Sequence, residues 1–257
     1  MGETNFKKSV GKFIFKDEVI LVGYRGSIAH GTYVPQDNPD SIDDKDVMAV
    51  IIPPIECILG IDTFGNRGTK EIKHEEWDVV TYTLQKYISL LVKNNPNVMS
   101  LLWLEDGDYI HVSSEGNILI DNRDIFVTKQ AYHSFIGYAH GQAHRMTHMK
   151  FEGYMGEKRK RLVEKHGYDT KNASHLIRLL RMGIEYLTDG RLYVKRKDAS
   201  QLLDIKRGEW KLENVQKEAD RLFVLAEEAY VRSTLPVEPD RKKVNELCVE
   251  IMKSRIC

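Results

Sequence analysis

Five residues of this 257-residue chain have types and spacing that suit chemistry: a Gly-Ser pair and three acids. Gly26 and Ser27 stand in a glycine-rich stretch, where unobstructed backbone N–H groups and a hydroxyl can hold a phosphate group. Gly26 and Gly31 have the separation of a P-loop, but Thr32 stands where a P-loop has lysine. The stretch is therefore a candidate phosphate cradle of another kind.

The acids Asp44 and Asp46 stand two residues apart at the beginning of a strand-like segment. Because side chains alternate along a strand, both carboxylates are expected on one face. Two such carboxylates repel each other unless a cation lies between them, and hard oxygen ligands suit Mg²⁺ or Mn²⁺. Asp78 begins a later apolar strand, and it completes a three-carboxylate site for two metal ions if the two strands are neighbours. Taken singly, each feature is also typical of an ordinary turn or strand end.

The order of these residues resembles the signature of the DNA polymerase beta nucleotidyltransferase superfamily. The chain is more closely similar to the predicted nucleotidyltransferases of an RNA-repair pathway polymerase beta family. The resemblance covers most of the chain, and the segments that carry it are GSIAHGT at 26–32, DDKDVMAVIIPP at 43–54, WDVVTYTLQKYISLLVKNNPNVMSLLW at 77–103, NASHLIRLLRMGIEYLTDGRL at 172–192, IKRGEW at 205–210 and the LPVEPDRKKVNELCVEI ending.

The resemblance implies a role for each of the five residues. Gly26 and Ser27 would hold the β- and γ-phosphates of an NTP. Asp44 and Asp46 would bind both metal ions, Mg²⁺ or Mn²⁺. Asp78 would bind the catalytic metal ion and help to deprotonate the acceptor hydroxyl.

One departure from the family pattern concerns the loop from Tyr33 to Ile42, which is longer than the family has. The motif reads Ser-Ile-Asp-Asp-Lys-Asp, which leaves the register between Asp43 and Asp44 open. The two-residue spacing favours Asp44, because Asp43 would face the other side of the strand from Asp46.

Alternating strand and helix patterns surround the acids. Apolar and β-branched runs predict strands at 19–23, 46–52 and 77–82, and helical spacing predicts helices at 84–93 and 98–104. With the resemblance, they predict an α/β nucleotidyltransferase domain with a mixed sheet over residues 1–124. Charged amphipathic stretches then predict an α-helical domain over 125–257, with helices in 127–150, 171–188, 198–205, 211–233 and 238–255.

Basic residues in the helical half are candidates for binding phosphate. His175, Arg178 and Arg181 recur every three residues along one edge of a predicted helix, where guanidinium groups could contact a triphosphate or an acceptor. The alternative is a solvated or salt-bridged face. Lys158, Arg159, Lys160 and Arg161 form the most basic run, with glycines at 153 and 156 that indicate a mobile loop. This run could contact an RNA backbone, or it could be ordinary solvated surface.

Four histidines lie on roughly one helical stripe: His133, His140, His144 and His148. The spacing permits zinc binding, but no carboxylate or cysteine follows at ligand spacing. We therefore expect a pH-sensitive polar face that lines an acceptor channel rather than a zinc site.

Composition limits the remaining classes. The 38 basic and 38 acidic residues balance, so no general attraction to nucleic acid or to acidic membranes is expected. Three cysteines without CxxC spacing argue against a disulfide framework or a cysteine zinc site. Apolar runs are too short for a membrane span, and a cytoplasmic protein is expected.

The resemblance, together with the candidate phosphate cradle and the three acids, implies a metal-dependent nucleotidyltransferase that moves an NMP from an NTP to an acceptor hydroxyl and releases pyrophosphate. The resemblance indicates an RNA end, such as that of a tRNA, as the acceptor. A protein side chain modified by an antitoxin-type enzyme is one alternative. A catalytically silent nucleotide- or RNA-binding module is the other.

Overall fold

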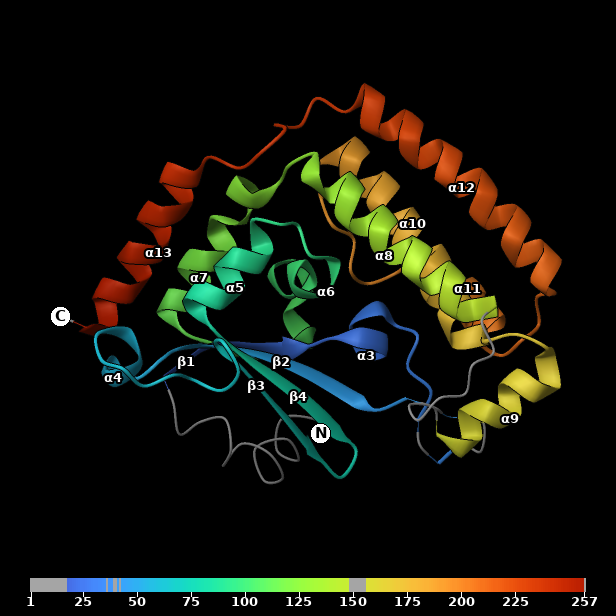
Figure 1. Ribbon diagram of the computed structural model, residues 1–257, viewed down its shortest axis with the longest axis horizontal. Helices are drawn as coiled ribbons and strands as arrows, with labels where there is room; N and C mark the ends of the chain where they lie inside the picture. The colour runs from blue at the N-terminus through green and yellow to red at the C-terminus, as the bar shows by residue number, and fades with distance from the viewer. Residues whose placement is uncertain (1–17, 36, 39–40, 42, 148–155, 257) are drawn as a thin grey trace. The chain divides into compact units, whose positions relative to one another are not determined.

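The computed structural model describes residues 18–35, 37–38, 41, 43–147 and 156–256, and this part of the chain forms two compact units (Figure 1). The first unit contains residues 18–29, 44–127 and 238–256. The second contains the described residues of 30–43 together with those of 128–237. Each unit is therefore assembled from segments that are distant in the sequence.

A mixed five-stranded sheet forms the centre of the first unit. Its strands are β1 (Glu18–Tyr24), β2 (Lys45–Ile52), β3 (Thr69–His74), β4 (Trp77–Thr83) and β5 (Tyr109–Val112). Their order is β3-β4-β2-β1-β5, and β2 and β4 run parallel while the other neighbours are antiparallel. The inner strands β1 and β2 are almost wholly apolar, as strands buried on both faces must be.

The strand β2 shows how the sheet divides the core. Val47, Ala49 and Ile51 share a buried cluster with Trp77 of β4 on one face. The alternate residues of β2, such as Met48, are also fully buried, and alternation places them on the opposite face. That second face continues toward the start of the strand as Asp46.

Helices of the first unit pack on the sheet and on one another. They are α4 (Ile55–Ile58), α5 (Leu84–Leu91), α6 (Pro96–Met99), α7 (Ser114–Asp121) and α13 (Arg241–Ile256), with 3₁₀ turns η2 (Ser100–Trp103), η3 (Asp106–Asp108) and η4 (Arg123–Phe126). Helix α5 packs on β2 and β4, while α13 packs on α5, α7 and η4 (Figure 1). Helix α3 (Gly26–His30) follows β1 directly.

The second unit is a set of helices around α10. Its helices are α8 (Gln130–Thr147), α9 (Glu157–His166), α10 (Thr170–Asp189), α11 (Ala199–Lys206) and α12 (Leu212–Arg232). Helix α10 packs on α8, α11 and α12. Asp169 caps its N-terminus by accepting from two backbone N–H groups, and Gly190 ends it with a φ of 65°.

The predicted fold class is confirmed: a mixed sheet with an α/β N-terminal part is followed by helices. Strands at 19–23, 46–52 and 77–82 are confirmed, and the structure adds β3 and β5, whose short sequences give little alternation. The units differ from the linear division at residue 124 in three segments: 30–43, 125–127 and 238–256. In the described part of the chain, no helix is long and apolar enough to span a membrane.

Candidate active site

The parallel pairing of β2 and β4 brings two of the predicted acids together. Asp46 is the register partner of Asp78, and each is the second residue of its strand. On the next strand, Lys73 of β3 is the register partner of Asp78. Register partners on neighbouring strands point to the same face, so a carboxylate pair and a lysine form one row across three strands.

Arg25 supplies a second positive charge to this row. Its backbone N–H donates to the Asp46 carbonyl oxygen at 2.9 Å. Its guanidinium Nη2 lies 3.6 Å from Asp46 Oδ1 and 3.5 Å from Asp78 Oδ1. Its Nε is buried without a hydrogen-bond partner among the described residues. The guanidinium of Arg25 therefore compensates both the Asp46 and the Asp78 carboxylate.

Asp44, the residue before β2, bonds to the lysine of the same row. Lys73 Nζ donates to Asp44 Oδ2 at 3.0 Å, and both side chains are exposed. This hydrogen bond, followed by the charges of Asp44, Asp78 and Asp46, raises the pKa of Lys73. All three acids therefore raise the pKa of the same lysine, which indicates that they lie in one region of the sheet surface.

The backbone at Gly26 packs against the carboxylate of Asp46. Gly26 has a φ of +60°, and a Cβ built there would lie 2.4 Å from Asp46 Oδ2. Any side chain at this position would therefore displace the acid. The neighbouring Ser27 is partly exposed, and its hydroxyl makes no hydrogen bond with the described residues.

The two adjacent acids Asp43 and Asp44 have different environments. Asp43 is buried, accepts from the Val34 backbone N–H at 3.0 Å and pairs with Lys206 and Lys171. Asp44 is exposed on the side of Lys73. These contacts give Asp43 a place in the core and leave Asp44 as the acid available to a ligand.

The donor set suits hard divalent ions, because the acids present only carboxylate oxygens. Among the described residues, however, no three His, Cys, Asp or Glu side chains come together closely enough to hold one metal ion. Asp44 Oδ2 instead accepts a hydrogen bond from Lys73 Nζ. The facing carboxylates of Asp46 and Asp78 are nevertheless ligands of the kind that a divalent ion prefers, so the donor types fit such an ion.

A model of the RNA repair pathway DNA polymerase beta family matches residues 6–250. The chain belongs to this family. The family and the fold are those of nucleotidyltransferases. No curated protein matches the chain. Among solved structures, a nucleotidyltransferase-like protein from Exiguobacterium sibiricum 255-15 is 11% identical, with 99% of this chain and 81% of that chain covered and a TM-score of 0.34.

In this polymerase beta family protein, the three basic residues that were predicted along one edge of a helix lie on α10, and their environments differ. Arg178 is buried, whereas His175 is partly exposed. Arg181 pairs with Asp198 at 2.7 Å and with Glu218 at 2.9 Å. The salt-bridged alternative therefore describes Arg181, while Arg178 has no such pair among the described residues.

The basic run at 158–161 lies on helix α9. The prediction of a mobile loop is wrong for residues 157–166, and residues 148–155 lie outside the described residues. Arg159 pairs with the capping residue Asp169 at 2.7 Å, and Lys160 pairs with Glu157 at 2.8 Å. Lys158 and Arg161 are exposed and make no ion pair with a described residue.

Three of the four striped histidines lie on α8, and His148 is outside the described residues. His133 contacts the rings of Tyr132 and Tyr230, and His140 stacks on Phe223 with ring centroids 4.4 Å apart. Through these contacts, His133 and His140 of α8 pack against side chains of α12.

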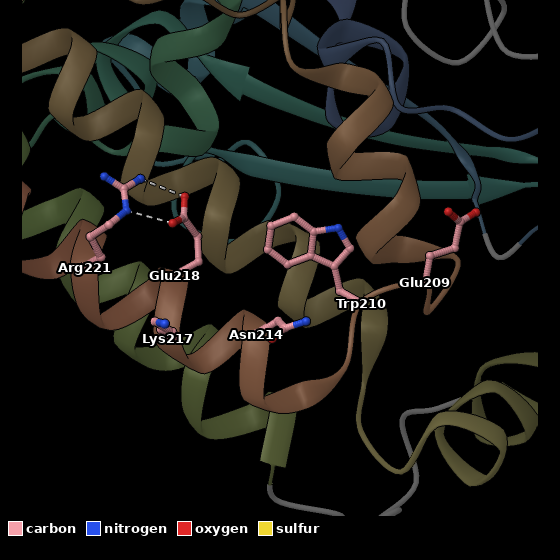
Figure 2. A pocket seen from close by; sticks show the side chains of 6 residues that line it. All are labelled: Glu209, Trp210, Asn214, Lys217, Glu218 and Arg221. Atoms are coloured by element: carbon pink, nitrogen blue, oxygen red, sulfur yellow. Dashed lines mark hydrogen bonds and ion pairs between the residues drawn. The ribbon is translucent and has the colours of Figure 1, made fainter.

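A pocket of about 580 Å³ lies at the start of α12 in the second unit (Figure 2). It is lined by Glu209, Trp210, Asn214, Lys217, Glu218 and Arg221. Arg221 forms two hydrogen bonds with Glu218, so this acid already serves two arginines. Of the predicted site residues, none lines this pocket.

Sequence reasoning did not identify Arg25 or Lys73 as partners of the acids. Arg25 directly precedes the Gly-Ser pair, and this position in the sequence could have identified it as a residue of the site. Lys73 lies on β3, a strand that the sequence pattern did not predict. Its role follows only from the pairing of β3 with β4.

Proposed function

We propose that this family member transfers a nucleotidyl group from an NTP to an acceptor hydroxyl and releases pyrophosphate. The observation that carries the proposal is the direct pairing of Asp46 with Asp78 on parallel strands, with Asp44 beside them. Two facing carboxylates are unfavourable without a cation, and here the compensating charges come from the side chains of Arg25 and Lys73.

Asp44, Asp46 and Asp78 would hold two Mg²⁺ or Mn²⁺ ions. When bound, such ions lower the pKa of an attacking hydroxyl and neutralise charge on the triphosphate. The three carboxylates carry three negative charges, whereas Arg25 and Lys73 carry two positive ones. The surplus negative charge and the solvent exposure of Lys73 favour exchange of these internal cations for metal ions.

In the transfer step, the acceptor oxygen attacks the α-phosphorus and the bond from that phosphorus to the bridging oxygen breaks. Asp78 orients the acceptor hydroxyl and takes its proton, and pyrophosphate leaves with the bonding electron pair. Gly26 and the free hydroxyl of Ser27 hold the departing β- and γ-phosphates. Arg25, released from its two carboxylates, lies next to this pair in the chain and adds a positive charge.

An RNA end is the acceptor that the family description favours. Lys158 and Arg161 of α9 support it, because they are exposed cations that make no ion pair with a described residue. Arg159 and Lys160 are engaged in ion pairs, so we assign the phosphate contacts to the first two residues. A protein acceptor would use the same donor chemistry.

The test uses the full chain with each α-³²P-labelled NTP, Mg²⁺ or Mn²⁺, and a pool of tRNA and cell proteins. We expect label in RNA that is lost in Asp46→Asn and retained in Asp62→Asn. Asp62 is the matched control, because it is exposed and makes no hydrogen bond or ion pair with another described residue.

The other outcomes separate the alternatives. Label in a protein band, lost in the same variant, would establish an antitoxin-type protein-modifying enzyme. Nucleotide binding without label in either pool would contradict transfer and favour a silent binding module. Equal labelling by wild type and Asp46→Asn would overturn the site assignment.

A further inference from the structure

Arg178 is a buried cation without an anionic partner. Arg178 is 9% exposed, and its Nη1 donates to the Met182 sulfur at 3.2 Å. Among the described residues, no carboxylate forms an ion pair with it. A thioether is a weak acceptor, and a buried charge without a partner is costly.

The charges of two other arginines of the second unit are compensated by acidic side chains. Arg196, equally buried, pairs with Glu185 and Asp198. Arg181, one helical turn from Arg178, uses Asp198 and Glu218. Figure 2 shows that Glu218 is also bonded to Arg221. The fold thus places acids beside these arginines and omits one beside Arg178.

The acid that acts electrostatically on Arg178 is already engaged. Asp198 favours the charged form of Arg178, but its Oδ1 accepts from Arg196 and its Oδ2 from Arg181. Burial, followed by the charge of Arg196, lowers the pKa of Arg178 to about 10. The side chain therefore remains charged at neutral pH in surroundings that do not stabilise it.

The groups around Arg178 are basic. Burial, followed by the charge of Arg178, lowers the pKa of both His30 and His175 well below the usual histidine range. His30 Nδ1 lies 2.9 Å from the Val194 carbonyl oxygen, which leaves its Nε2 for another contact. Lys195 also adds positive charge at His30, and Lys171 adds it at His175. The local field is thus positive and suits an anion.

We infer that Arg178, with His30 and His175 beside it, forms an oxyanion site within the second unit that binds a phosphate group. The guanidinium fork matches phosphate oxygens, and a bound phosphate supplies the negative charge that the fold omits. The identity of the ligand as an NTP rests on the proposed function, but the existence of an oxyanion site does not. Arg181 has a structural role instead.

Two methionine substitutions on the same helix distinguish these roles. Arg178→Met removes an uncompensated buried charge, so the ligand-free protein should be as stable as wild type or more stable. Arg181→Met removes two ion pairs and leaves Asp198 and Glu218 with fewer partners, so its midpoint of unfolding should fall. A structural Arg178 would instead make both variants unstable.

The measurement is binding of inorganic tripolyphosphate in EDTA, by calorimetry and by thermal unfolding at constant ionic strength with sulfate as the control anion. Wild type should bind and unfold at a higher temperature with tripolyphosphate. Arg178→Met should bind at least about tenfold more weakly and lose the shift, which is the effect of one charged contact. Arg181→Met should keep the shift. Arg178→Lys, which keeps the charge but loses the fork, should bind with intermediate affinity.

Equal binding by wild type and Arg178→Met would overturn the inference. If Arg178→Met does not fold, equal binding by wild type and Arg178→Lys would do so. Binding of an RNA oligonucleotide without terminal phosphates that depends on Arg178, when tripolyphosphate binding does not, would overturn it in favour of an RNA-backbone site. Because no metal or turnover is involved, Asp46→Asn should bind tripolyphosphate normally, and a failure of transfer alone would leave this site standing.

Discussion

Asp46 and Asp78 face each other across the parallel strands β2 and β4, and the guanidinium of Arg25 lies within 3.6 Å of both. Adjacent strands are about 4.8 Å apart, so this pairing fixes two carboxylates at a separation that a cation can bridge. The transfer chemistry that we propose requires a cation at such a place, and in the structure the protein's own arginine occupies it.

Asp78→Asn should abolish transfer without unfolding the protein. Loss of one carboxylate removes a metal ligand, which is worth several kcal/mol in the transition state, so turnover should fall about a thousandfold or more. Mn²⁺ binding, followed by electron paramagnetic resonance, should weaken in parallel. Wild-type Mn²⁺ affinity in Asp78→Asn would show that this acid is not a ligand.

Asp43→Asn and Asp44→Asn should separate stability from activity. Asp43 is buried against Lys206, so its neutralisation removes the carboxylate charge that compensates this buried lysine and should lower the free energy of unfolding by about 3–5 kcal/mol. Asp44 is exposed, so its loss should change that free energy by less than about 1 kcal/mol. Urea unfolding measures the stability of each variant and the transfer assay measures its activity, which should fall in Asp44→Asn. The reverse pattern would assign the motif's first acid to Asp43.

Gly26→Ala should impair both stability and transfer. Alanine at a φ of +60° costs about 1–2 kcal/mol, and its Cβ would displace the Asp46 carboxylate. Gly137→Ala on α8 is the matched control, because a Cβ there meets nothing within 4 Å. Alanine favours a helix interior, so this control should gain about 0.5–1 kcal/mol and keep full activity. Denaturant titration with activity assays would test the pair, and an active Gly26→Ala would contradict the close packing on Asp46.

The stability of the protein should decrease as the pH falls below about 6.5, partly because of His30 and His175. Burial lowers the pKa of both histidines in the folded state, so the unfolded chain binds protons first as the pH falls from the usual value of 6.5. The stability is therefore fully present above that pH and is lost below it.

The corresponding measurement is the free energy of unfolding from pH 7.5 to pH 5.5. His30→Asn and His175→Asn should each have a shallower dependence on pH than wild type, and the double variant a shallower one still. His133→Asn, which changes an exposed residue of α8, should follow wild type. An unchanged slope in the double variant would contradict the role of these two histidines.

Local patterns predicted the strands that carry the acids and the long helices of the second unit. The apolar run before Pro53 became β2, and the Leu176–Leu187 stripe became the buried face of α10. These elements follow from the period of two or 3.6 in the sequence itself. The short strands β3 and β5 and helix α9 lack such a strong period and were missed.

The sequence by itself determined which residues could do the chemistry: the Gly-Ser pair, the three acids and the basic edge of α10. Only the tertiary structure decided that Asp46 lies opposite Asp78, that Asp43 is buried, and that α13 packs with the first unit. It also decided that Arg181 is compensated while Arg178 is not. Residue type and period are local properties, whereas strand register, burial and ion pairing depend on contacts between segments far apart in the chain.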